Sequence, residues 1–341
     1  MNTTAHARQK GRHRSKASSV PETEVSFSIL INNYNYDRFL AKAIDSAFGQ
    51  TWPHVQIIVV DDGSTDNSRE IAQSYTGDNY LFLPKDNGGQ NSCIAFGLPY
   101  VTGDYTIILD ADDWLTPDAC ETIAGAIGRS APNLVMYRLE IVDTENRSVG
   151  SFPNFPFEAE NQRDYIRKNG FVPSSPTSGN AYRTSFLRAA FAFVKEGTFS
   201  SDGYLATAAG WTEQVVCLQD RLGFYLVHGA NASTVAGWDR RRRYANNNYA
   251  LDHHRHLFSY LSAKGEWHDD WKRLISAYVW RDILFFKLAE RRYAEFPWGS
   301  CRTLGIKKFL NAPYIGIWRK LKNITFLTVG SLWGELRELV E

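Results

Sequence analysis

The stretch TIILDADDW, residues 106–114, joins a short apolar segment to three aspartates within four positions. Residues 106–109 favour a β-strand, and Asp110, Asp112 and Asp113 follow where that strand ends. Carboxylates that lie this close repel one another, and burying them away from water is costly. The sequence therefore predicts either solvent or a neutralising cation at the end of this strand.

Strand and helix patterns alternate on both sides of that stretch, from residue 25 to residue 135. The expected strands are short apolar runs, whereas the expected helices repeat apolar residues every three or four positions. Strands are expected at 25–31, within 55–64, at 80–84 and at 106–109, and helices at 37–50, from Thr65 or Asp66, and at 92–99. This order is typical of an α/β fold with a mostly parallel sheet, in which ligands bind beyond the carboxyl ends of the strands.

The composition of the 341-residue chain limits its compartment and its partners. A formal net charge of +1 gives no general attraction for nucleic acid, so no nucleic-acid partner is expected. The four cysteines are scattered without a CxxC pair, which is typical of free thiols in a reducing compartment such as the cytoplasm. Residues 1–24 are expected to form a disordered basic tail, because the first twenty residues carry five Lys and Arg side chains and no acid.

The C-terminal segment, residues 238–341, is expected to be a helical extension. From Gly305 onward it combines basic and aromatic residues, but no run reaches the roughly 18 apolar residues of a membrane-spanning helix. Two alternatives stay open for it, attachment to an anionic membrane surface and packing on the protein's own core. The run HHRH, residues 253–256, is interpreted as a solvated helix face and not as a metal site.

Several motifs between residues 25 and 133 carry a resemblance to one family. They are SILINNYNY (28–36), FLAKAIDSAFGQTWPHVQIIVVDDGSTDNS (39–68), NGGQNS (87–92) and GDYTIILDADDWLTPDA (103–119). In this order and spacing they resemble the start of family-2 glycosyltransferases of the bacterial polysaccharide type, which have the GT-A nucleotide-sugar-binding fold. A second stretch, from PTSGN (176–180) to HGANAS (228–233), is similar to bacterial members of that family.

The resemblance implies a GT-A catalytic domain over residues 25–237, with a nucleotide-sugar half at 25–135 and an acceptor half at 136–237. Such enzymes move a sugar from a nucleotide-diphosphate sugar to a hydroxyl and invert the anomeric centre. A UDP-sugar is the donor expected first, and a glycan or a lipid-linked sugar is the expected acceptor. The enzyme is then expected in the cytoplasm, with peripheral attachment to the inner face of the membrane as the alternative.

Two neighbouring acids at the end of a predicted strand, Asp61 and Asp62, are expected to bind the nucleoside. Their carboxylates can accept hydrogen bonds from a base imide N–H and from a ribose hydroxyl. A turn followed by a helix cap at residues 63–65 would explain the same DDGS sequence without a ligand. Asn33 and Tyr34 follow the first strand, and by resemblance they are expected to line the base pocket.

The loop DNGGQNS, residues 86–92, precedes a predicted helix, where backbone N–H groups favour anions. Gly89 and Gln90 are therefore expected to contact the sugar or the diphosphate. The family commonly has Arg or Lys and then Asn where this chain has Ile94 and Ala95. That departure motivates a non-catalytic nucleotide-sugar-binding module as an alternative function.

Asp110, Ala111 and Asp112 resemble the family's DxD motif, in which a divalent cation bridges a protein carboxylate and the donor diphosphate. Mn²⁺ and Mg²⁺ prefer carboxylate and phosphate oxygens and commonly take few protein ligands. By resemblance, Asp112 binds the metal, Asp110 faces the ribose or the diphosphate, and His228 is a further metal or diphosphate ligand. A structural loop histidine is the alternative for His228.

Inversion in one displacement needs a carboxylate that takes the proton from the acceptor hydroxyl. Asp202, in SSDGYL (200–205), matches the family's base position. Its alternative role is a negative charge that stabilises a helix N-terminus, with Ser200 or Ser201 as the cap. Gly179 and Asn180, in PTSGN, are expected to shape the acceptor side.

Other enzyme classes fit these motifs less well. A haloacid-dehalogenase-type phosphatase also has Asp-x-Asp after a strand, but it normally has Thr or Val where Trp114 stands, and it has no use for DDGSTD at 61–66. It remains an alternative to the glycosyltransferase. A Rossmann dehydrogenase is disfavoured because no GxGxxG follows the first strand.

Overall fold

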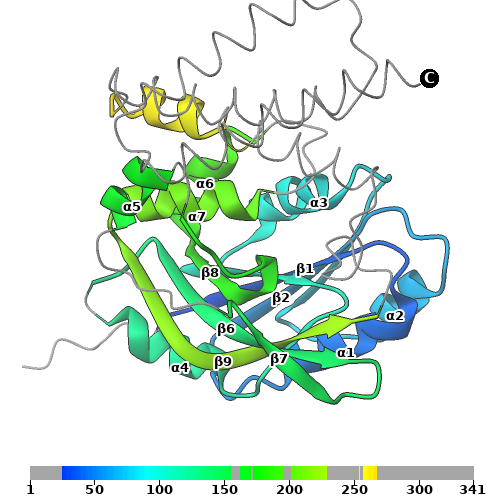
Figure 1. Cartoon of the computed structure of the whole chain (residues 1–341). Helices are drawn as coiled ribbons and strands as arrows, with labels where there is room; N and C mark the ends of the chain where they lie inside the picture. The colour runs from blue at the N-terminus through cyan, green and yellow to red at the C-terminus, as the bar shows by residue number, and fades with distance from the viewer. Residues whose placement is uncertain are drawn as a thin grey trace, which may run out of the picture.

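The computed structural model describes residues 25–128, 130–154, 162–169, 172–194, 201–228, 253 and 256–266. These residues form an α/β fold, which confirms the class predicted from the alternating strands and helices (Figure 1). The elements in chain order are β1 (Phe27–Asn33), α1 (Asp37–Phe48), β2 (Val55–Asp61), α2 (Ser68–Ser74), β3 (Tyr80–Pro84), α3 (Gln90–Gly97), η1 (Leu98–Tyr100), β4 (Tyr105–Asp110), β5 (Trp114–Leu115), α4 (Ala119–Ile127), β6 (Leu134–Asp143), β7 (Ser148–Phe152), α5 (Gln162–Asn169), η2 (Thr177–Gly179), β8 (Asn180–Arg183), α6 (Thr184–Phe191), α7 (Asp202–Trp211) and β9 (Val215–Val227).

A nine-stranded sheet runs in the order β3-β2-β1-β4-β8-β6-β9-β5, and β7 pairs with β6. β1 pairs in parallel with β2 and β4, and β2 pairs in parallel with β3, so the four strands expected from the sequence form one parallel block. β8 joins this block to β6 through antiparallel pairing on both sides, and β9 runs parallel to β6. The sheet is therefore parallel as far as β4 and mixed beyond it, where Figure 1 shows β9 as a long curved strand.

The carboxyl ends of the parallel strands meet at one edge of the sheet. Asn33, at the end of β1, is in register with Asp61, at the end of β2. On the other side of β1, Asn32 is in register with Asp110, at the end of β4. The two acidic motifs of the sequence thus lie on either side of one strand, at the edge where α/β sheets bind ligands.

Side chains of the parallel strands alternate between two cores. Leu30 and Ile108 face the core formed with α3, α6 and α7, whereas Ile31 and Leu109 face the core formed with α1, α2 and α4. Figure 1 shows these two sets of helices on opposite faces of the sheet. Because both faces are covered, the strands read as continuous apolar runs and not as alternating ones.

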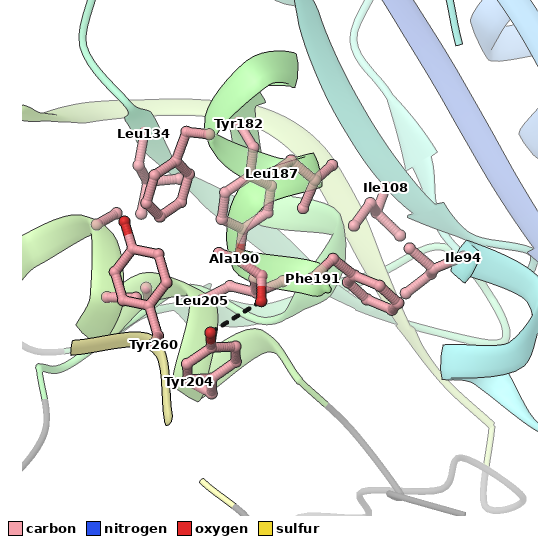
Figure 2. Close-up of a cluster of buried hydrophobic side chains, with 14 of the residues drawn as sticks. Ile94, Ile108, Leu134, Tyr182, Leu187, Ala190, Phe191, Tyr204, Leu205 and Tyr260 are labelled. Carbon is pink, nitrogen blue, oxygen red and sulfur yellow. Dashed lines mark hydrogen bonds between the residues drawn. The ribbon is translucent and has the colours of Figure 1, made fainter. Parts of the chain in front are cut away.

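Helices α6 and α7 dominate the first of these cores (Figure 2). The Tyr204 hydroxyl of α7 donates a hydrogen bond of 2.9 Å to the Ala190 carbonyl of α6. Tyr260, from the helical residues 256–263, belongs to the same cluster and meets Phe186 edge-on, with 6.2 Å between ring centroids. This short part of the C-terminal extension therefore packs on the α/β domain through buried apolar contacts.

The histidines of HHRH differ from their interpretation as a solvated face. His253 and His256 are 6% and 1% exposed, and the ring of His256 meets Tyr204 edge-on at 5.3 Å. Both rings therefore lie against the protein and not toward solvent. The interpretation is therefore wrong for these two histidines.

Residues 1–24, 229–252 and 267–341 lie outside the described residues. The basic tail, most of the C-terminal extension and the two alternatives for the segment from Gly305 therefore stay predictions. Within the described ranges, no helix is both long enough and apolar enough to cross a membrane.

Candidate active site

Asp110 ends β4 with its carboxylate between two amide side chains. Its Oδ1 accepts hydrogen bonds from Asn32 Nδ2 at 2.8 Å and from Gln90 Nε2 at 2.7 Å. Burial, followed by the charge of Asp112, raises the pKa of Asp110 to about 7. The fold thus brings Gln90, from the glycine-containing loop, onto the first aspartate of the DxD motif.

Asp113 lies inside the protein, with 1% of its surface exposed. Its Oδ2 accepts a hydrogen bond from Ser178 Oγ at 2.6 Å, and its Oδ1 accepts one from the Leu226 backbone N–H at 3.1 Å. Ser178 Oγ also accepts a hydrogen bond from the Asp110 N–H at 3.1 Å. Burial, followed by the charges of Asp112 and Asp110, raises the pKa of Asp113 well above its usual range. The third aspartate therefore links the end of β4 to η2 and to β9, and these buried hydrogen bonds fix the position of the DxD motif.

Asp112 lies in contact with His228, and the family resemblance makes both of them candidate metal ligands. The distance from Asp112 Oδ2 to His228 Nε2 is 3.0 Å, although 116 positions separate them in the chain. β9 ends directly before His228, so the sheet carries this ring to the DxD motif. The ring packs against Phe39, with 4.7 Å between centroids, and meets Tyr36 edge-on at 5.7 Å.

Tyr36 and Phe39 are site residues that sequence reasoning missed. They lie just before α1 and in its first turn, and they form an aromatic wall beside His228. Burial, followed by the charges of Asp112 and Asp110, raises the pKa of the Tyr36 phenol. The available signal was their position, directly after the polar end of β1, where a parallel sheet places its ligands.

Asp61 and Asp62 are buried, with 0% and 2% of their surfaces exposed. Asp61 Oδ2 lies 3.1 Å from Arg69 Nε, and Asp62 Oδ1 lies 2.6 Å from Lys85 Nζ. Asp62 Oδ2 also accepts a hydrogen bond from the Gly89 N–H at 2.6 Å. Each carboxylate thus has a basic partner within the protein, and their contacts with a nucleoside stay predictions.

The other residues expected around the base and the diphosphate differ in exposure. Asn33 is buried and donates from Nδ2 to Asp61 Oδ1 at 3.0 Å, whereas Tyr34 is 45% exposed. The ring of Tyr34 is therefore accessible from solvent, and a flat base could stack on it. Gly89 has a φ of 84°, a conformation that favours glycine, and this turn aims its N–H at Asp62. Ala111 is buried between the two acids of the DxD motif.

Gly179 and Asn180 lie beneath the site, in η2 and at the start of β8. A Cβ on Gly179 would stand 2.6 Å from the Ser175 Cβ, so this position has no room for a side chain. Asn180 is fully buried and donates from Nδ2 to the carbonyls of Ser175 and Pro176, at 3.1 and 2.7 Å. Both residues shape the backbone that presents Ser178 to Asp113, and their contact with an acceptor stays a prediction.

Asp202 is the first residue of α7, and its Oδ1 accepts a hydrogen bond of 2.8 Å from the next residue's N–H. Burial and Asp112 are the main causes of the raised pKa of Asp110, and the charge of Asp202 adds to them. The expected base is therefore within electrostatic range of the DxD motif. Ser201 differs from expectation, because its hydroxyl makes no cap bond to α7 and donates instead to Asn91 Oδ1 at 2.8 Å.

The residues at this edge fit a divalent cation with few protein ligands. Among the described residues, no three His, Cys, Asp or Glu side chains converge on one metal position. Mg²⁺ in phosphate-transferring sites commonly takes one or two carboxylates and completes its shell with substrate phosphates and water. The adjacent Asp112 carboxylate and His228 ring offer such a partial set, and a cation there would offset the repulsion among the aspartates.

The sequence of this chain is similar to that of known glycosyltransferases. Residues 28–191 match the model of the glycosyl transferase family 2. The chain is 33% identical over 214 residues to a glycosyltransferase of Nostoc sp., a match that covers 61% of this chain and 66% of that one. It is 34% identical over 98 residues to glycosyltransferase GlyA of Streptococcus pneumoniae, covering 28% of this chain and 14% of GlyA. The chain thus matches less than two thirds of the length of these relatives.

Among solved structures, the chain is similar to residues 1–349 of S. aureus TarS in complex with UDP-GlcNAc. That similarity has a TM-score of 0.59 at 18% identity and covers 84% of this chain and 82% of TarS 1–349. A second crystal structure of S. aureus TarS 1–349 gives a TM-score of 0.55 at 17% identity and covers 84% of this chain and 81% of that one. At such identities the likeness concerns the fold, which is GT-A. The family match, with the glycosyltransferase relatives, shows that the chain contains a glycosyltransferase family 2 domain that includes residues 28–191.

Proposed function

We propose that this protein is an inverting glycosyltransferase that moves a sugar from a nucleotide-diphosphate sugar to a hydroxyl of a glycan or a lipid-linked acceptor. One observation carries the proposal: the Asp112–His228 pair, Asp110 and Asp202 gather at one edge of the sheet, from three separate parts of the chain. A site for charged phosphates and a carboxylate base are the two elements that this reaction requires.

Asp112 and His228 would hold a Mn²⁺ or Mg²⁺ ion together with the donor diphosphate. When bound, this cation supplies positive charge that stabilises the departing nucleoside diphosphate. Asp110, held by Asn32 and Gln90, would orient the ribose or the diphosphate at the same edge. Asp61 and Asp62 would fix the floor of the nucleoside pocket, and the exposed ring of Tyr34 would cover the base.

Asp202 would remove the proton from the acceptor hydroxyl as that oxygen attacks the anomeric carbon. The attack proceeds in line with the departing diphosphate oxygen, so the new bond forms on the opposite face of the sugar and the configuration inverts. A positioned general base contributes roughly 10²- to 10⁴-fold to such a step. Asp202 stands at the start of a helix packed on the buried cluster of Figure 2, which gives it a rigid support.

UDP-sugars are the first donors to test, since the UDP-GlcNAc complex of TarS has a similar fold. The experiment measures nucleoside-diphosphate release from a panel of UDP-, dTDP- and GDP-sugars with Mn²⁺, alongside the shift in melting temperature that each ligand produces. Release from one nucleotide sugar, stimulated by a glycan acceptor, supports the proposal. Binding without release would favour a nucleotide-sugar-binding module, and phosphate release from simple esters would favour a phosphatase.

Attachment to a membrane is a separate part of the proposal. If the segment from Gly305 lies on the inner face of the cytoplasmic membrane, the acceptor is a lipid-linked sugar at that surface. Removal of the residues after Gly305 would then release the protein from vesicles that contain anionic lipid. Equal vesicle binding with and without the segment would contradict membrane attachment through these residues.

A further inference from the structure

Two adjacent amide side chains begin α3, and they hold different parts of the site. Gln90 Nε2 donates to Asp110 Oδ1 at 2.7 Å, on the donor side. Asn91 Oδ1 accepts a hydrogen bond of 2.8 Å from Ser201 Oγ, the residue directly before Asp202. One helical turn after the glycine-containing loop is therefore bonded both to the DxD motif and to the segment that carries the expected base.

The bond between Asn91 and Ser201 is buried, and it replaces a common helix-capping bond. The two residues are 6% and 2% exposed. Ser201 occupies the N-cap position of α7, where a serine hydroxyl usually accepts a hydrogen bond from a helix N–H. Here the hydroxyl donates to a residue 110 positions earlier in the chain instead. A buried polar bond between two distant helix starts fixes their separation, because breaking it leaves a polar group without its bond inside the protein.

We propose that Asn91 is a positioning residue that acts through Ser201 to set the distance between the Asp202 carboxylate and the donor held at Asp110. The proposal deepens the proposed function and rests on it. Asn91 does not touch the reacting atoms in this account. It joins the start of the donor-side helix α3 to the start of the base-bearing helix α7, and this bond fixes the position of the base relative to the donor.

The expected effect follows from the geometry of proton transfer. A general base must lie within hydrogen-bond reach of the hydroxyl that it deprotonates. A displacement of about 1 Å can cost roughly 10²-fold in rate, even when the altered residue is remote from the chemistry. Loss of the Asn91–Ser201 bond should therefore reduce kcat and leave donor binding nearly unchanged, because Gln90 still reaches Asp110.

The test uses Asn91→Leu, Ser201→Ala and the double variant that combines these two substitutions. Ser201→Thr, which keeps the hydroxyl, is the conservative variant to which they are compared. The activity measured is nucleoside-diphosphate release from the best donor of the panel with Mn²⁺, with water or the glycan acceptor receiving the sugar. We expect both single variants to lose 10- to 100-fold in kcat, with the donor KM within about threefold of wild type. The double variant should be no slower than the slower single variant, since both remove one bond. Ser201→Thr should recover most of the rate.

Thr106→Val is the matched control for stability. Thr106 shares a buried hydroxyl–hydroxyl hydrogen bond of 2.9 Å with Thr184, near the amino end of β4 and away from the site. Thr106→Val should lower the melting temperature about as much as Asn91→Leu and Ser201→Ala do, because each substitution removes one buried hydrogen bond, but it should leave kcat normal. Wild-type kcat in folded Asn91→Leu and Ser201→Ala, or additive losses in the double variant, would overturn the proposal. A wild-type protein that releases nothing from any donor would instead overturn the proposed function, so the two failures are distinct.

Discussion

An acidic pair and a cluster of three aspartates flank β1 at the same edge of the sheet, and the protein compensates their charges to different extents. Asp61 and Asp62 lie against Arg69 at 3.1 Å and Lys85 at 2.6 Å. Asp110, on the other side of β1, accepts hydrogen bonds from two neutral amides. The first pair is thus compensated by the protein itself, before any ligand binds.

In the second cluster, Asp110, Asp112 and Asp113, the His228 ring lies 3.0 Å from Asp112, whereas Asp110 and Asp113 are held by neutral groups. Asp113 accepts hydrogen bonds from a serine hydroxyl and a backbone N–H, both neutral. Burial and the neighbouring carboxylates raise the pKa values of Asp110 and Asp113. Two buried carboxylates that neutral donors hold beside a third would gain more from a bound cation than the Asp61–Asp62 pair, which already has basic partners. The difference separates an acidic pair that basic side chains neutralise from an acidic cluster whose repulsion a bound cation would offset.

Asp112→Asn should produce the largest effect, because it removes the carboxylate assigned to the cation. We expect turnover to fall by about 10³-fold or more, since a catalytic cation contributes several kcal/mol of charge stabilisation. The rise in melting temperature given by nucleoside diphosphate with Mn²⁺ should also disappear, while the fold stays intact. Asp78→Asn, at an exposed position, is the control. Full activity of the wild type in excess EDTA would contradict the cation site.

Asp202→Asn should lower kcat by two or more orders of magnitude at saturating donor, because it removes the proton acceptor and keeps the size of the side chain. Donor affinity should change little. If Asp202 only stabilises the start of α7, the variant should lose roughly 0.3–1 kcal/mol of stability and keep its rate. Melting temperature and kcat measured on one preparation distinguish the two roles, and a folded variant with wild-type kcat would exclude Asp202 as the base.

The parallel half of the fold could be predicted from the sequence because its information is local. Each of β1 to β4 is a short apolar run, and its partners come from the next strands in the same block. β8 and β9 carry equally ordinary patterns, but they insert beside β4 and β6, far away in the chain. Local periodicity does not encode such pairings, so the mixed half of the sheet was not predicted in detail.

The same limit applies within the candidate site. Residue types at strand ends indicated Asp61, Asp62, Asp110 and Asp112, and the fold places all four at one edge. Their partners were not visible, because contacts such as that of Asp113 with Leu226 join residues 113 positions apart. For the same reason the sequence offered Ser200 or Ser201 as a local cap, although the Ser201 hydroxyl bonds to a distant residue.

Lys85→Met tests the compensated side of the comparison. Lys85 is 12% exposed and Asp62 is 2% exposed, so the substitution leaves a buried carboxylate without its ammonium partner. Breaking one partner of a buried pair typically costs about 3–5 kcal/mol, and partial exposure of Lys85 places the expected loss at the lower end. Chemical denaturation with and without Mn²⁺ measures it, and the loss should not depend on the cation. Arg69→Met should cost less, because the Arg69 side chain is 46% exposed.

Asp110→Asn should have the smallest effect on stability. In metal-free protein at pH 8 it should raise the stability, whereas Lys85→Met and Arg69→Met should lower it. The pKa of Asp110 is raised from 3.8 to about 7, so the folded protein binds this proton more tightly than the unfolded chain. Stability contributed by the protonated group is present below the unfolded pKa and is lost as the pH rises toward 7. The asparagine can still accept the hydrogen bonds from Asn32 and Gln90, and it removes one charge from the repelling cluster. Denaturation of metal-free protein between pH 4 and pH 8 should therefore show a smaller decline for the variant than for the wild type. A variant that is less stable than wild type at pH 8 without metal would mean that the charge of Asp110 is already compensated, and the contrast between the two acidic sites would fail.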